Sequence, residues 1–65
     1  MKIPTRDQLV KRRAIVIADA QMKLEVGDYH GTADCCMDLR EIEAQITLFD
    51  LLREANVIAS RVENA

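Results

Sequence analysis

The sequence has 65 residues, of which 49% are hydrophobic and 31% are charged, and its formal net charge is -2. This length corresponds to one small domain over residues 1–65 and excludes an enzyme built from two lobes around a cleft. The composition is that of a globular protein and excludes a disordered chain. Because a chain this short buries only about 60% of its unfolded surface, we expect a disulfide, a metal or a partner subunit to support the fold.

The cysteines and the hydropathy pattern favour a partner subunit as that support. The two cysteines, Cys35 and Cys36, are adjacent, and vicinal cysteines rarely pair because the small ring strains the peptide bond between them. Unpaired cysteines are typical of a reducing cytoplasm. No apolar run approaches the roughly 18 residues that span a bilayer, and the N-terminus lacks the apolar region of a signal peptide. We therefore expect a cytoplasmic protein that does not enter a membrane.

The first helix is predicted over about residues 6–26. The segment from Thr5 to Gln8 has the pattern of a capping box, in which both side chains accept hydrogen bonds from backbone N–H groups. Asp7 suits the positive end of the helix dipole. The next helix breaker is Gly27, which we expect to end the helix in the left-handed conformation.

The second helix is predicted over about residues 32–62. Residues 28–31 are expected to form a tight turn, after which Thr32 caps the helix and Asp34 lies in its first turn. Neither Gly nor Pro follows in the sequence. Two helices joined by a short connection make an antiparallel αα-hairpin, so the predicted fold class is all-α.

Hydrophobic residues recur at helical spacing and predict which faces pack. In the first helix the central face carries Val10, Ala14, Ile17 and Leu24, widened by Leu9, Val16 and Ala20 on one side and by Ile15, Ala18 and Met22 on the other. The second helix has one seam of Cys35, Leu39, Ile42, Ile46 and Phe49, and another of Leu48, Leu52, Ala55, Ala59 and Val62. Both helices are therefore apolar over a wider arc than one partner helix covers.

The unequal lengths of the two helices predict an unpartnered segment. At about 1.5 Å per residue, the first helix is roughly 30 Å long and the second roughly 45 Å. The last three turns of the second helix, residues 51–62, then extend past the first; we name them the overhang. An exposed apolar surface of this extent marks an interface, and a homodimeric four-helix bundle would bury it. Alternatively, the chain is a monomer and a foreign partner covers this surface. The expected self-association residues are Leu48, Leu51, Leu52, Ala55, Ile58 and Ala59.

Charge is distributed unevenly along the chain. Residues 1–27 hold six basic and three acidic residues, whereas residues 28–65 hold three basic and eight acidic ones. Opposite charges on the two helices favour their antiparallel pairing. Alternatively, the basic residues form a patch that contacts an acidic protein surface, a small anionic nucleotide or a nucleic acid. The candidate patch residues are Arg6, Lys11, Arg12 and Arg13. The negative net charge and an aromatic content of 3% weigh against nucleic acid.

The residues around the turn include the candidates for metal binding or nucleophilic chemistry. His30, Asp34 and Asp38 recur every four residues, but zinc sites use paired Cys or His at recognisable spacing. The alternative is that His30 bridges the turn while both cysteines pack in the core. A hairpin offers no cleft that excludes water from a Cys–His pair, so we expect no metal, no cofactor and no catalysis. Tyr29 and His30 are candidate partner contacts on an exposed turn; alternatively, Tyr29 folds back over the end of the hairpin.

Two resemblances concern the turn and the start of the second helix. Residues 27–34 are similar to the turn inside a tetratricopeptide repeat, which implies a shared turn only, because solenoids need several repeats. Residues 27–31, 33–34 and 38–44 resemble very short helical-hairpin accessory proteins of tailed phages and prophages, through Gly-Asp-Tyr-His-Gly, Ala-Asp and Asp-Leu-Arg-Glu-Ile-Glu-Ala. This resemblance implies an accessory role in an infected bacterial cell, where such proteins inhibit or adapt a host protein or sequester a molecule used in defence.

Overall fold

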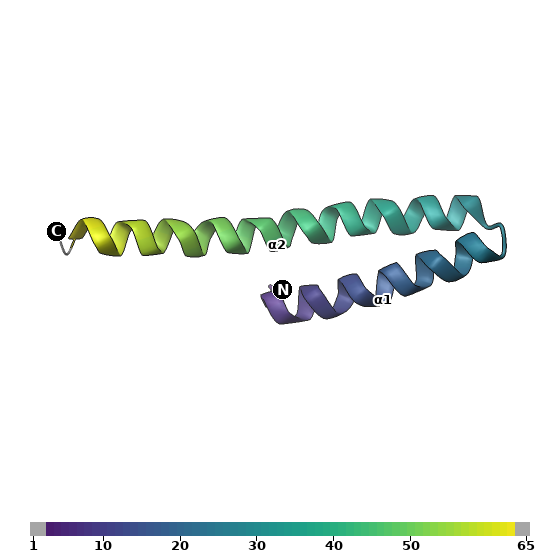
Figure 1. Ribbon diagram of the computed structural model, residues 1–65, viewed down its shortest axis with the longest axis horizontal. Helices are drawn as coiled ribbons and strands as arrows, with labels where there is room; N and C mark the ends of the chain where they lie inside the picture. Colours follow the sequence, from purple (N-terminus) through teal and green to yellow (C-terminus); the bar gives the residue numbers. More distant parts are fainter. Residues whose placement is uncertain (1–2, 64–65) are drawn as a thin grey trace.

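The computed structural model describes residues 3–63 and shows two antiparallel helices joined by a short turn (Figure 1). Helix α1 covers Arg6–Glu25 and helix α2 covers Tyr29–Glu63. No strand occurs within these residues, which confirms the predicted all-α hairpin. The molecule is a rod with extents of 57 × 20 × 16 Å, and neither described helix is both long and apolar enough to cross a membrane.

Both ends of α1 follow the local sequence signals. The backbone N–H of Gln8 donates to Oγ1 of Thr5 at 3.2 Å, and the N–H of Thr5 donates to Oε1 of Gln8 at 2.9 Å. These two bonds form the predicted capping box. At the other end, Gly27 has a φ of +78°, and its N–H donates to the carbonyl of Leu24 at 3.1 Å. The left-handed glycine that ends the helix is therefore also confirmed.

Helix α2 begins three residues earlier than predicted, at Tyr29. The cap is Asp28, whose Oδ1 accepts a hydrogen bond from the N–H of Gly31 at 2.9 Å. Thr32, which we predicted as the cap, lies inside the helix, and its hydroxyl donates to the carbonyl of Asp28 at 2.7 Å. Asp and Thr both cap helices well, and a helical Thr commonly bonds back to a carbonyl four residues earlier. Residues 29–31 are thus the first turn of α2, and the separate tight turn was wrong.

The core is a small cluster between the two helices. Leu9 from α1 packs with Ile42 and Ile46 from α2, and each of these side chains is at most 5% exposed. Val10, Val16 and Phe49 pack against this cluster while remaining partly exposed. Cys35 is the other buried apolar side chain of the described residues. The predicted seam of α2 is therefore the one that faces α1.

The face of α1 that packs on α2 differs from the prediction. Ile17 and Leu24, expected at its centre, are 40% and 54% exposed. The buried and half-buried positions of α1 are Leu9, Val10, Arg13, Val16, Asp19, Ala20 and Lys23. Of the predicted central residues only Val10 is among them, and the packed face is centred on the predicted flank with Leu9, Val16 and Ala20. Long basic side chains can cover apolar surface with their stems while their charged ends reach water. The packed face of α1 is therefore not its most hydrophobic face.

The overhang extends past the end of α1 (Figure 1). Arg6, the first residue of α1, contacts Asp50 of α2, so α1 covers α2 only up to that level. All residues from 51 to 62 are exposed. The unpartnered segment predicted from the helix lengths is therefore present.

Candidate functional site

An exposed apolar surface runs along the overhang on one face of α2. Its members are Leu48, Leu51, Leu52, Ala55, Ile58, Ala59 and Val62, and we name this set the apolar stripe. The three leucines and Ile58 are each 54–56% exposed, and Val62 is 70% exposed. All six residues predicted to mediate self-association thus share one solvent-facing surface.

The apolar stripe faces away from α1. Ala55 lies at the centre of the stripe, whereas Arg53 continues the α1-facing seam beyond Phe49. Two residues along an α-helix correspond to a rotation of about 200°, so Ala55 and Arg53 point roughly 160° apart. The contact between α1 and α2 therefore leaves the stripe entirely free.

A shallow groove lies along the opposite side of the overhang. The residues that line it are Phe49, Leu52, Arg53, Asn56, Val57, Ser60 and Arg61, so Leu52 borders both the groove and the stripe. The seam that packs on α1 continues through Phe49, Arg53, Asn56 and Ser60, but it becomes polar after Phe49. The groove side of the overhang is therefore of mixed polarity, whereas every member of the stripe is apolar.

The structure places the residues of the predicted basic patch in different environments. Nε of Arg6 donates to Oδ1 of Asp50 at 2.8 Å, and this hydrogen bond holds the pKa of the Asp50 carboxyl below its ordinary value. Arg13 is half-buried on the face of α1 that packs on α2, whereas Lys11 and Arg12 are exposed. Only part of the predicted patch is therefore directed to solvent.

The exposed turn residues lie far from the basic ones. Tyr29 is 73% exposed, so it does not fold back over the hairpin. Nε2 of His30 lies 3.8 Å from Oδ2 of Asp34 on the outer surface of the first turns of α2. Lys11 lies about 20 Å away along α1. The two groups of candidate contacts therefore form separate surfaces.

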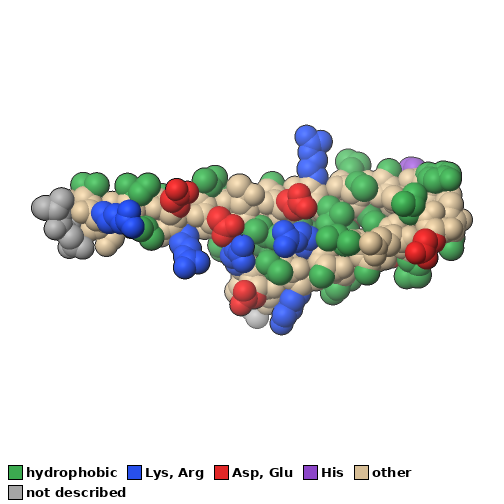
Figure 2. All heavy atoms as spheres, viewed as in Figure 1, with side chains coloured by type: hydrophobic (Ala, Val, Ile, Leu, Met, Phe, Trp, Pro, Cys, Tyr) green, Lys and Arg blue, Asp and Glu red, His purple; other side chains and the backbone are tan. Residues whose placement is uncertain are grey.

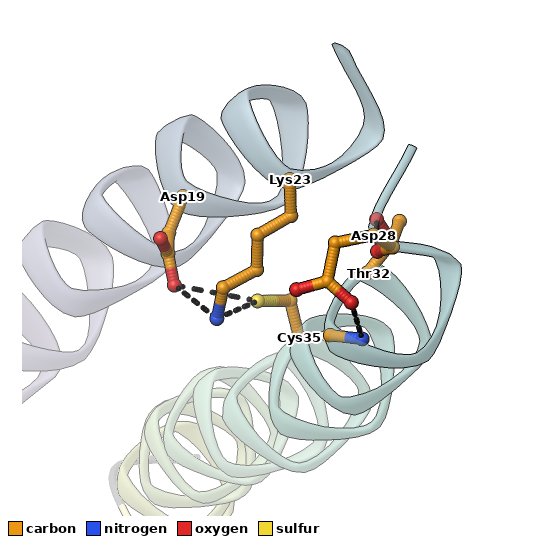
Figure 3. Close-up of polar contacts among 6 residues, drawn as sticks. Asp19, Lys23, Asp28, Thr32 and Cys35 are labelled. Carbon is orange, nitrogen blue, oxygen red and sulfur yellow. Dashed lines mark hydrogen bonds and ion pairs between the residues drawn. The ribbon is translucent and has the colours of Figure 1, made fainter. Parts of the chain in front are cut away.

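A polar cluster between the helices was not predicted (Figure 3). Nζ of Lys23 lies 3.0 Å from Oδ2 of Asp19, which also accepts a hydrogen bond from the buried thiol of Cys35 at 3.5 Å. The Lys23 hydrogen bond is the main reason why the pKa of Asp19 is lowered. Burial, followed by the bond to Asp19, raises the pKa of the Cys35 thiol. Cys35 is thus held as a neutral thiol, which is a poor nucleophile.

The sequence contains part of the signal for this polar cluster. Asp19 and Lys23 are spaced as an i, i+4 ion pair, and Cys35 belongs to the seam of α2. Their meeting depends on which face of α1 packs, and the prediction chose a different face. The expectation that both cysteines pack was half wrong, because Cys35 is buried but Cys36 is exposed.

The structure thus presents surfaces suited to contact with other molecules. Hydrophobic side chains occupy much of the visible outer surface of both helices (Figure 2). Among residues 3–63, no group of three or more His, Cys, Asp or Glu side chains is placed to hold a metal ion. The candidate surfaces are the apolar stripe, the exposed pair Lys11 and Arg12, and the turn with Tyr29 and His30. Comparison with family models, curated proteins and solved structures finds no match to this chain.

Proposed function

We propose that this protein acts by binding, without catalysis, as a homodimer joined through the apolar stripe. The observation that carries the proposal is the imbalance between buried and exposed apolar side chains. Four apolar side chains of the described residues are buried, whereas the whole stripe is open to solvent. Such a surface on a soluble chain is typical of an interface.

The accessible area supports a second copy as the occupant of the stripe. The chain exposes 5669 Å², whereas a compact monomer of its 7.4 kDa mass exposes about 4,200 Å². The difference is about 1,500 Å². A stable protein–protein interface needs about 800 Å² from each partner. The excess accessible area of the elongated chain is thus larger than the area that one partner contributes to a stable interface.

We further propose that the partner is a host bacterial protein in the cytoplasm of an infected cell, which the dimer inhibits or adapts. The support is the resemblance of residues 27–44 to phage accessory hairpins, together with the exposure of Tyr29. Tyrosine is enriched among residues that dominate binding energy. The turn lies at the opposite end of α2 from the stripe, so self-association leaves Tyr29 and His30 available.

Binding of a small anionic nucleotide or of nucleic acid through Lys11, Arg12 and Arg13 is the alternative. It has less support because the charges are not gathered on one open surface. Arg6 is held by Asp50, and Arg13 is half-buried. The two patch residues that remain exposed and unpaired with Asp50, Lys11 and Arg12, give few phosphate contacts.

Solution mass by light scattering tests the homodimer. We expect the wild type to have the mass of a dimer and Leu52→Glu to have the mass of a monomer, because the substitution places a charge in the stripe. Ser60→Glu is the matched control, since it adds the same charge on the groove side of the overhang and should remain dimeric. A monomeric wild type would refute the proposal.

Separate measurements distinguish the partner classes. A host-protein inhibitor should form a stable complex with a protein from bacterial lysate, and Tyr29→Ala should lose it while Leu24→Ala, on the surface of α1, retains it. A nucleotide-binding protein should instead gain thermal stability with increasing nucleotide concentration. Nucleic-acid binding should weaken steeply with added salt. Retention of the protein complex by Tyr29→Ala would exclude the turn as the contact.

A further inference from the structure

We infer that the two copies pair their apolar stripes in antiparallel orientation, so that the two hairpin turns point to opposite ends of one long rod. This inference rests on the proposed homodimer and adds its orientation. The same stripe allows a parallel and an antiparallel pairing, and these differ in which residues meet. The residues that precede and follow Leu48 on the same face of α2 determine which of the two pairings is favoured.

The stripe has the spacing of a coiled-coil seam. Leu48, Leu51, Ala55, Ile58 and Val62 alternate at spacings of three and four residues, which places them in line on a supercoiled helix. The same spacing toward the turn reaches the positions Ala44, Glu41, Met37 and Asp34, all of which are exposed. The seam is therefore continuously apolar from residue 44 to residue 62 and carries acidic residues nearer the turn.

Parallel pairing would place like residues opposite each other. Glu41 would meet Glu41 of the second copy within the seam, and Asp34 would meet Asp34. Like charges brought together in this way disfavour an interface. Ala55 would also face Ala55, and two small side chains in one layer fill the space between helices poorly.

Antiparallel pairing avoids both problems. In the register that sets Leu51 opposite Ala55 of the second copy, Leu48 lies opposite Ile58 and Ala44 lies opposite Val62. Every layer between residues 44 and 62 is then apolar, and the alanines face larger side chains, as close packing requires.

The flanking positions are compatible with this register. Leu52 lies beside Leu52 of the second copy at the two-fold axis and extends the apolar contact. Glu41 lies beyond the last described layer of the stripe and does not face Glu41 of the second copy. Glu54 lies near Glu54 of the second copy at the solvent-exposed edge of the interface, where hydration and salt keep the repulsion between the two carboxylates small.

The orientation has a direct consequence for binding. With a rise of about 1.5 Å per residue, the two copies of Tyr29 are separated by roughly 70 Å along the rod. The dimer then presents one turn at each end and is able to hold two partner molecules at once. A parallel dimer would instead present both turns side by side to one partner.

The distance between the two copies of Cys36 tests the orientation. Cys36 is exposed, and Cys35 is buried, so a nitroxide spin label should attach to Cys36 in the native protein. Double electron–electron resonance should give a separation of about 50 Å for the antiparallel dimer. A parallel dimer would give less than about 20 Å, which is the width of a helix pair.

Two controls make the result decisive. Cys36→Ser should take up no label, which verifies that Cys35 does not contribute to the measured distance. Light scattering on the labelled sample reports its mass. A dimer with the short distance would overturn the antiparallel orientation and leave the proposed homodimer standing, whereas a monomer would overturn both.

Discussion

Nε of Arg6 donates a hydrogen bond to Oδ1 of Asp50 at 2.8 Å, and its Nη2 reaches Oδ2 of the same carboxylate at 3.4 Å. This forked contact joins residues 44 positions apart in the sequence. Arg6 is the first residue of α1, and Asp50 directly precedes the overhang. The contact therefore marks the boundary between the part of α2 that builds the hairpin and the part that is free to bind.

The Arg6–Asp50 contact predicts a specific response to acid. The pKa of Asp50 is lowered from its ordinary value of 3.8, mainly by the hydrogen bond from Arg6. A lowered folded-state pKa stabilises the fold above pH 3.8, and this contribution is lost as the pH falls through the folded-state value. We expect Asp50→Asn to lower the Tm at neutral pH and to make the Tm decrease less as the pH falls. Circular dichroism measures both effects. Asp38→Asn, an exposed acid of α2, should keep the wild-type decline.

Two isoleucines of different exposure test the position of the core. Ile42 is 3% exposed and Ile15 is 69% exposed. Ile42→Ala should lower the free energy of unfolding by about 2–4 kcal/mol, because it removes packed methyl groups and leaves a cavity. Ile15→Ala should have little effect. Urea unfolding at one fixed protein concentration measures both, since association contributes to apparent stability. An equal loss for Ile15→Ala would show that the outer face of α1 is covered in solution.

The turn predicts an unusual effect of exchanging glycine for alanine in a helix. A Cβ at Gly31 would lie 2.9 Å from Cγ of Asp28 and 2.9 Å from Cδ of Lys23. Although alanine normally favours a helix by about 1 kcal/mol over glycine, Gly31→Ala should not stabilise the protein, because it displaces the Asp28 cap. Removing a cap typically costs about 1 kcal/mol, which offsets the gain. Thermal unfolding should show that Gly31→Ala raises the Tm only in an Asp28→Ala background, and the same effect in both backgrounds would contradict this explanation.

The adjacent cysteines should differ in reactivity. Cys36 is exposed, whereas Cys35 is buried and its thiol pKa is raised by burial and by Asp19. Iodoacetamide should therefore modify Cys36 first and reach Cys35 only when the hairpin opens, as measured by peptide mass spectrometry. In concentrated urea the two rates should converge. Equal rates in the native protein would mean that Cys35 is not packed against α1.

The features that were predictable from the sequence depend on short stretches of chain or on α2 alone. The Thr5–Gln8 capping box and the left-handed Gly27 are set by residues a few positions apart, and both occur. The seam with Ile42 and the exposed stripe around Ala55 follow from the periodicity within one long helix. These signals do not require knowledge of how α1 is rotated.

The rotation of α1 was not predictable from its periodicity. Leu9 and Val10 are adjacent apolar residues that point about 100° apart, so apolar spacing supports either face. The packed face includes Arg13 and Lys23, which a search for hydrophobic stripes rejects. For this reason the Asp19–Lys23–Cys35 cluster was missed. The start of α2 was misplaced for a related reason, since Asp28 and Thr32 are comparable caps and only the fold selects one.

Every buried apolar side chain that the structure describes precedes Asp50 in the sequence. Substitutions in residues 51–62 therefore leave the buried core of the hairpin intact while they alter the stripe. The buried core and the proposed self-association surface thus lie largely in different parts of one continuous helix. Substitutions in the last three turns would then change self-association without changing the core of the hairpin or the turn with Tyr29.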